Sequence, residues 1–159
     1  MRPRVPNISG LNMNNDLQKF ISELESKQFA TATGRAIHAK LQKIILSPTR
    51  TGDPELIAKI ESMGDELTSF FGANSKSELP IAGFINGEFL SRRIDRLVVD
   101  DATKTVRVLD YKTDINTAKF RDKYIAKMNE YIKLMQKIYP CYKVDGYILW
   151  LHNWTLERI

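Results

Sequence analysis

Two short apolar segments of the chain each deliver one carboxylate. Asp95 lies within Ile94–Val99, and Asp110 lies within Val108–Asp114, which also carries Lys112. Residues i and i+2 of a strand share a face, so Asp110 and Lys112 are expected to project in the same direction. Two acids that can share a divalent cation, next to an ammonium group, suit metal-dependent hydrolysis of a phosphodiester.

Each of these acids also has a purely structural interpretation. Asp95 could pair with a neighbouring arginine, and the candidates are Arg92, Arg93 and Arg96. Asp110 is expected to share a face with Val106 and Val108, where a carboxylate needs a partner because uncompensated burial of its charge is costly. A metal ion could be that partner, and Lys112 is the competing one.

A histidine, His38, stands beside the apolar stripe of a predicted helix. A helical histidine taken alone is usually a packing or hydrogen-bonding residue rather than a ligand. Its local context, Gly34–His38, becomes informative only together with the two acidic segments.

Taken in order, the motifs resemble the nuclease domain of the RecB and AddA helicase–nucleases of the PD-(D/E)xK superfamily, closest to the AddA-like C-terminal domain. The resemblance runs from about Phe29 to Leu151. An isolated Asp-x-Lys is a weak signal, whereas the ordered set is much stronger. The motifs that carry it are Gly34–His38, Ser77–Pro80, Ile94–Val99, Val108–Asp114, Tyr124–Tyr131 and Tyr147–Leu151.

The resemblance implies a role for each matching residue. His38, Asp95, Asp110 and the main-chain carbonyl of Tyr111 match the ligands of a catalytic Mg²⁺ or Mn²⁺. Lys112 matches a lysine that orients the attacking water or stabilises developing phosphate charge. Oxygen donors suit these metals. A lysine held near acids stays charged, so it acts as a positioned cation rather than as a base.

Two further matches are catalytic candidates with open alternatives. Glu78 could bind a second metal or hold Lys112, or it could be an exposed acid at the start of a strand. Tyr131 matches a tyrosine of the helix after the Asp-x-Lys strand, and it also fits the core stripe of that helix. Two positions depart from the family: Lys127 replaces the usual glutamine, and Arg92 replaces a common glycine. Either could contact a phosphate or alter the cleft.

Lysines form the candidate DNA-binding surface. Lys119, Lys123 and Lys127 follow an i, i+4, i+8 row that can lie along a phosphate backbone. A solvated helix face is the alternative. Lys40 and Lys43 could add to a basic rim, together with Arg92. No segment resembles a base-reading helix, so DNA binding with little sequence specificity is expected.

The composition fits this interpretation without proving it. The 159 residues carry a net charge of +5, with a net-acidic stretch over residues 51–100 between two basic flanks. Such a pattern suits polyanion binding around a metal site, although ordinary surface charge explains it equally well. The single cysteine, Cys141, excludes a disulfide framework and a four-cysteine iron–sulfur cluster. No apolar run is long enough for a membrane span, so a cytoplasmic protein is expected.

The spacing of apolar residues, which indicates the elements that position these side chains, changes along the chain from helical to strand-like. Residues 1–15 are expected to form a flexible arm, and residues 16–159 a single nuclease domain. Apolar spacing predicts helices from Asp16, over Thr33–Leu46 and from Asp53, followed by strands and one long helix. The later elements are a hairpin from Leu79 to Val99 with its turn at Asn86-Gly87, a strand over Thr105–Lys112, a helix over Thr117–Tyr139 and a strand over Val144–Leu151.

The sequence therefore predicts an α/β (α+β) fold with a restriction-endonuclease-like central mixed sheet, flanked by helices and preceded by a helical segment. The expected function is Mg²⁺- or Mn²⁺-dependent cleavage of DNA in repair or recombination, with a helicase subunit as a possible partner. A catalytically weak DNA-binding or helicase-docking module of the same fold is the main alternative. A regulatory ribonuclease using the same site is a third interpretation.

Overall fold

A computed structural model describes residues 13–159 of the chain. The chain divides into two compact units, Met1–Arg35 and Ala36–Ile159. Most of the expected N-terminal arm, residues 1–12, lies outside the described residues, while residues 13–15 belong to the first helix.

The N-terminal helices differ from the prediction. Helix α1, Met13–Gln42, is one continuous helix where the sequence predicts two. Thr33, where the second predicted helix begins, therefore lies inside α1, and the helix ends at Gln42 rather than at Leu46. The stretch between the two predicted helices contains no proline, and the neighbouring Gly34 weakens a helix without ending it.

The third predicted helix is divided into three shorter helical elements. The predicted start at Asp53 is confirmed. Asp53 caps α2 (Pro54–Ser62), and its carboxylate accepts hydrogen bonds from the backbone N–H groups of Glu55 and Leu56 at 3.0 and 3.1 Å. The chain then leaves the helix at Gly64, where φ is 95°. The remainder forms α3 (Asp65–Thr68) and the 3-10 turn η1 (Ser69–Phe71).

A five-stranded mixed sheet follows, with its strands in sequence order: β1 (Ser75–Ile85), β2 (Glu88–Asp100), β3 (Thr105–Lys112), β4 (Lys143–Trp150) and β5 (Thr155–Arg158). Neighbouring strands are antiparallel except β3 and β4, which are parallel and joined by α4 (Thr117–Ile138). The predicted hairpin, third strand, long helix and buried strand are confirmed. β5 was not predicted, because four residues are too few to show a period.

The hairpin turn follows directly from its sequence. Asn86 and Gly87 adopt φ values of 51° and 78° between the paired residues Ile85 and Glu88. A two-residue turn with both φ values positive matches the right-handed twist of the strands it joins.

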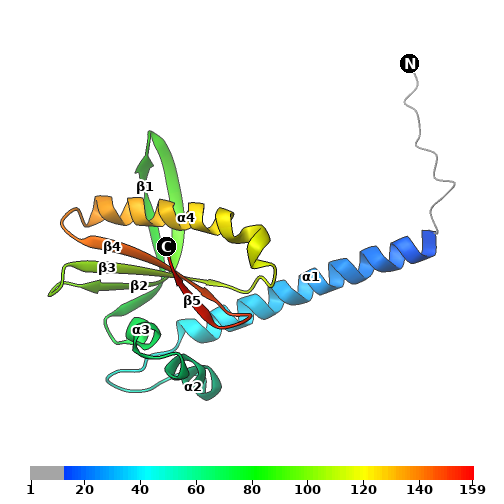
Figure 1. The fold of residues 1–159 in the computed structure, drawn as a ribbon, viewed down its shortest axis with the longest axis horizontal. Coiled ribbons are helices and arrows are strands. Elements are labelled where there is room, and N and C mark those ends of the chain that lie inside the picture. Colours follow the sequence, from blue (N-terminus) through cyan, green and yellow to red (C-terminus); the bar gives the residue numbers. More distant parts are fainter. Residues whose placement is uncertain (1–12) are drawn as a thin grey trace. The chain divides into compact units, whose positions relative to one another are not determined.

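Helices flank both faces of the sheet, which confirms the predicted fold class (Figure 1). α4 packs on one face, where Gly146 of β4 leaves room for it: a Cβ there would lie 2.7 Å from Met128. The helical elements α2, α3 and η1 and the C-terminal end of α1 share a second buried cluster with the other face. No helix in residues 13–159 has the length and apolar character needed to cross a membrane.

A buried arginine fastens the C-terminal end of α1 to the sheet. Arg96 of β2 is 1% exposed. Its guanidinium donates hydrogen bonds to the carbonyl oxygens of Leu41 and Ile44 at 2.7 and 3.3 Å and to the hydroxyl of Tyr111 at 3.0 Å. The last carbonyls of a helix have no partner within the helix and carry partial negative charge. Arg96 therefore satisfies the end of α1 while fixing its position.

We predict that Arg96→Met lowers the free energy of unfolding by about 3 kcal/mol, because it leaves several buried acceptors without a donor. Arg50→Met is the matched control, since Arg50 forms an exposed ion pair with Glu61. It should change the free energy of unfolding by less than about 0.5 kcal/mol. Urea denaturation measures both values. Equal effects of the two substitutions would contradict the role assigned to Arg96.

Candidate metal centre

The site lies where β2 and β3 separate. Their ladder ends at the pair Arg96 and Leu109. Beyond that pair, the backbone N–H of Tyr111 donates to a carboxylate oxygen of Asp95 at 2.7 Å instead of to a strand. β3 meanwhile stays paired with β4 as far as Lys112. The Asp95 side chain thus bridges the gap between the strands, at the end of β3 that carries Asp110 and Lys112.

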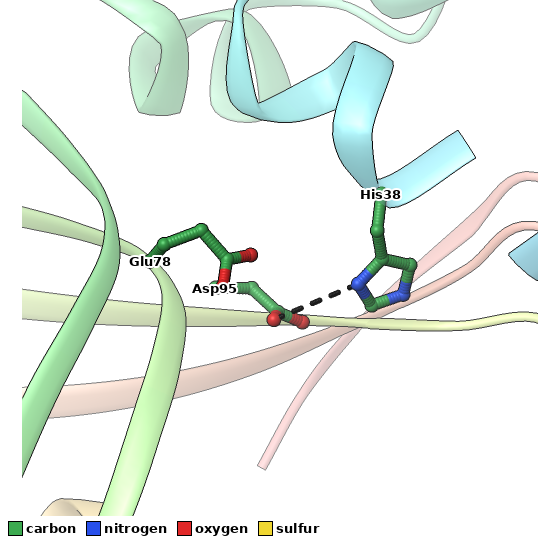
Figure 2. A group of neighbouring side chains, drawn as sticks. All are labelled: His38, Glu78 and Asp95. Atoms are coloured by element: carbon green, nitrogen blue, oxygen red, sulfur yellow. Dashed lines mark ion pairs between the residues drawn. The ribbon is translucent and has the colours of Figure 1, made fainter. Parts of the chain in front are cut away.

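Three potential ligand side chains from three elements meet at this gap. His38 comes from near the end of α1, Glu78 from β1 and Asp95 from β2 (Figure 2). One ligand atom of each lies within 4.8 Å of the others, and His38 Nδ1 is 3.7 Å from Asp95 Oδ1. An imidazole and two acids far apart in the sequence are therefore close together in the fold.

The backbone of Glu78 is strained. It lies opposite Asp95 in the hairpin, between the pairs Ser77 with Arg96 and Leu79 with Ile94, but its φ is 51°. A non-glycine residue in this conformation costs about 1–3 kcal/mol, and such residues cluster at functional sites. This conformation occurs where the Glu78 carboxylate lies next to Asp95 and His38. Glu78 therefore belongs to the candidate ligand group, which its local sequence does not show.

Asp110 and Lys112 form the second part of the site. As the strand spacing predicts, their side chains meet, with Lys112 Nζ 2.6 Å from Asp110 Oδ2. The ammonium also lies 4.5 Å from the ring centre of Tyr124 on α4, whose hydroxyl donates a hydrogen bond to Asp114. Lys112 is therefore held between a carboxylate and an aromatic ring.

The expected and observed groups share the side chains of His38 and Asp95, and each contains one acid that the other lacks. The sequence predicts His38, Asp95, Asp110 and the carbonyl of Tyr111, whereas the observed group contains Glu78 with His38 and Asp95. Asp110 instead forms an ion pair with Lys112, the partner expected if its role is structural. It remains near the group, since its charge raises the pKa of both Asp95 and His38.

Burial and like charge set the protonation of these groups. Burial, followed by the negative charge of Asp110, raises the pKa of Asp95 from 3.8 to about 8. Burial also lowers the pKa of His38, so the imidazole is neutral at pH 7 and has a free lone pair to offer. Closely spaced acids and a neutral imidazole can act as ligands of a divalent cation, and such a cation would stabilise the ionised form of the acids.

The aromatic candidates Tyr111 and Tyr131 are both buried near the acids. The ring of Tyr111 packs edge-on against the His38 ring, with the ring centres 5.4 Å apart. Hydrogen bonding to the Tyr111 backbone raises the pKa of the imidazole, against the larger lowering by burial. Burial and then the charges of Asp110 and Asp95 raise the pKa of Tyr131, so its hydroxyl keeps its proton. That hydroxyl donates to the carbonyl of Arg93 at 3.4 Å. Tyr131 both packs in the core and borders the site.

The candidate DNA-binding side chains have varied surroundings. Lys119, Lys123 and Lys127 are exposed on α4, and Lys127 Nζ lies 6.0 Å from the ring centre of Tyr131. Lys43 is exposed beyond the end of α1. The other two form ion pairs: Lys40 with the helix cap Asp53 at 3.1 Å, and Arg92 with Glu130 at 3.0 Å.

Three residues around the site were not singled out for these roles by sequence reasoning. Arg96, considered only as a partner for Asp95, instead holds the end of α1. Arg93 lies 3.5 Å from Glu78 with a side chain that is 67% exposed. Tyr124 precedes Tyr131 by two helical turns on α4, a spacing that signals a shared face and could have identified it.

No protein-family model matches the chain, and no curated protein matches it. The functional argument therefore depends on the geometry and chemistry of the site.

The raised pKa of Asp95 predicts a pH dependence for the metal-free protein. Above about pH 4 the unfolded chain releases the proton that folded Asp95 still holds, so the free energy of unfolding decreases as the pH rises towards about 8. The lowered pKa of His38 acts in the opposite direction, below its ordinary value of 6.5. Between pH 6.5 and 8, Asp95→Asn should therefore flatten the profile measured by urea denaturation in EDTA. Parallel wild-type and variant profiles would contradict the assignment.

Proposed function

We propose that the protein is a Mg²⁺- or Mn²⁺-dependent deoxyribonuclease that hydrolyses DNA phosphodiester bonds in repair or recombination. The observation that supports this most directly is the meeting of His38, Glu78 and Asp95 within 4.8 Å, beside the Asp110–Lys112 pair. The motif order further supports membership of the RecB and AddA nuclease group, which makes a helicase subunit a candidate partner.

In this proposal His38, Glu78 and Asp95 hold the cation, with Asp110 and the carbonyl of Tyr111 as neighbouring oxygen donors. When bound, such a cation polarises a phosphoryl oxygen and lowers the pKa of a bound water. One imidazole among oxygen donors favours Mn²⁺ over Mg²⁺, since imidazole suits transition metals better than Mg²⁺.

Lys112 supplies the fixed positive charge of the site. Its ammonium cannot swing freely, because Asp110 contacts it at 2.6 Å and the Tyr124 ring at 4.5 Å. A preorganised cation stabilises charge that develops on phosphate oxygens without having to reorient during the reaction. Asp110 orients Lys112 in this scheme, so its loss should affect the lysine as well as the ligand group.

The surrounding cations suit the phosphate backbone. Arg93 is exposed beside Glu78, and the row formed by Lys119, Lys123 and Lys127 lies on the helix that also carries Tyr124 and Tyr131. Contacts of this type hold DNA in place and carry no base information. Cleavage with little sequence preference is therefore proposed.

The central test is cleavage of linear and circular DNA by the purified protein with Mg²⁺ or Mn²⁺. Asp110→Asn and Lys112→Gln should each lower the rate by about 100-fold or more, because Lys112 supplies the positive charge that acts in the transition state and Asp110 holds that lysine in place. Asp122→Asn and Lys133→Gln are matched controls on the exposed surface of α4, and they should cut like the wild type.

The possible outcomes separate the candidate functions. An inert wild type with both metals, or candidate-site variants that cut as fast as the controls, would refute the deoxyribonuclease proposal. Metal-independent DNA binding without cleavage would instead favour the binding or docking module. Preferential cleavage of RNA in competition with DNA would favour the ribonuclease interpretation.

The Tyr124 ring generates a separate prediction. Tyr124→Leu should lower kcat by about 10-fold with little change in KM, because a partly desolvated cation–aromatic contact contributes about 1–2 kcal/mol to holding Lys112. Tyr124→Phe keeps the ring and should stay within about threefold of the wild type. Tyr142→Leu is the matched control, since it removes a ring 4.9 Å from Lys104. If the Leu and Phe variants of Tyr124 have equal kcat, the ring does not position Lys112.

A further inference from the structure

The tip of the β1–β2 hairpin exposes two phenylalanines. Phe84 and Phe89 are partners across the strands, and each is 59% exposed. Their rings lie 5.4 Å apart in an edge-to-face arrangement. Phe70 and Phe71, by contrast, are fully buried. A cross-strand aromatic pair can stabilise a hairpin, but this pair leaves much of its ring surface in water.

The hairpin has one covered face and one bare face. Ile81 and Leu90 are buried on the covered face, where Leu134 of α4 lies 2.9 Å from the position of a Cβ at Gly83. In an antiparallel pair, directly opposed residues share a face and alternate pairs share the same one. The other face, which we call the bare face, consists of exposed residues: Pro80, Ala82, Phe84, Phe89, Ser91 and Arg93.

The bare face leads directly to the candidate metal centre. Glu78 and Asp95 occupy the next positions of the same alternation, and Arg93 lies 3.5 Å from Glu78. The hairpin tip extends beyond α4 (Figure 1). Phe84 lies six positions after Glu78 on β1, a distance of roughly 20 Å along a strand. This corresponds to at most about six nucleotides, the number for a fully stacked strand at 3.4 Å each; an unstacked strand spans the same distance with fewer.

The chemistry of the bare face selects an unpaired strand over a duplex. Aromatic rings stack on nucleobases of any sequence, and the bases must be free of a duplex stack to reach them. The small side chains of Pro80, Ala82 and Ser91 leave room next to the backbone, and the exposed Arg93 can contact a phosphate. The bare face carries no acid between Glu78 and Phe84 on β1 or between Phe89 and Asp95 on β2. Arg93, which pairs with Glu78 but is 67% exposed, is the one charged side chain of the bare face, and its sign suits a polyanion.

We propose that the bare face binds single-stranded DNA, with Phe84 and Phe89 stacking on unpaired bases that lie no more than about six nucleotides from the phosphate held at the metal centre. The nucleotide spacing depends on the proposed nuclease function. Binding by the two rings does not, because the metal-free protein presents the same surface.

Fluorescence anisotropy in EDTA tests the binding, with labelled single-stranded and blunt duplex oligonucleotides of equal length. Replacing both Phe84 and Phe89 by Leu should weaken single-strand binding at least about tenfold, since a stacked base contributes on that scale. Duplex binding should change by less than about threefold. Replacing both by Tyr keeps the rings and should preserve single-strand binding. Ile138→Ala, which alters a side chain that is 51% exposed outside the hairpin, is the matched control.

Photocrosslinking of the wild type to a single strand that contains 5-iodouracil is an independent measurement. It uses no variant, so misfolding of a variant cannot affect it. A crosslink in the peptide that contains Phe84 and Phe89 is expected, and crosslinks confined to other segments would overturn the proposal. Equal loss of single-strand and duplex binding in the Leu pair, or no loss, would also overturn it. So would a self-associated wild type in sedimentation analysis that the Leu pair converts to monomer, since the rings would then cover a second copy of the chain.

These outcomes are distinguishable from failure of the nuclease proposal. A protein that cuts nothing but loses single-strand binding in the Leu pair refutes the nuclease and supports the bare face. If the protein cuts DNA but binds single strands equally well with Leu or Phe at both positions, the nuclease proposal is supported and the bare-face proposal is refuted.

Discussion

The candidate site depends on the hydrogen bonds of one buried guanidinium. Arg96 connects the last carbonyls of α1 with the hydroxyl of Tyr111 on β3, and it also stacks 4.3 Å from the ring centre of Phe71. His38 precedes Leu41, the principal acceptor, by about one helical turn. The distance between the imidazole and the strand acids is therefore set by an interaction in which the side chains of His38, Glu78 and Asp95 take no part. Such supporting contacts determine whether a constellation of side chains keeps its geometry.

The second constraint is the separation of β2 from β3 immediately after Arg96. A regular ladder would have used the N–H of Tyr111 for strand pairing, whereas here the Asp95 carboxylate accepts it. The same region contains the left-handed Glu78. The register of the sheet places Glu78, Asp95 and Asp110 in one row across β1, β2 and β3, and the irregular backbone at this row leaves the Asp95 side chain free to accept from Tyr111. The closeness of Asp110, together with burial, raises the pKa of Asp95. A bound cation would offset this repulsion and favour the ionised carboxylates.

Sequence reasoning was successful where the signal is local. Asn86-Gly87 defines a hairpin, alternation defines β3, and the four-and-three spacing from Phe120 to Ile138 defines α4. It also identified Asp110 and Lys112 as neighbours, because a strand imposes that relation. It failed where the outcome depends on weak local preferences, as at Thr33 and Gly64, or on short elements such as β5. The position of Glu78 next to His38 and the capture of α1 by Arg96 depend on long-range register, which one sequence does not display.

The central claim is that His38, Glu78 and Asp95 share one divalent cation. Anomalous diffraction from crystals grown with Mn²⁺, recorded for the wild type and for Glu78→Gln, tests this most directly. The account predicts one strong peak at coordination distance from the His38 imidazole and the carboxylates of Glu78 and Asp95 in the wild type, and a weaker peak in the variant. A map without a peak between these residues, or with Mn²⁺ bound only elsewhere, would contradict it.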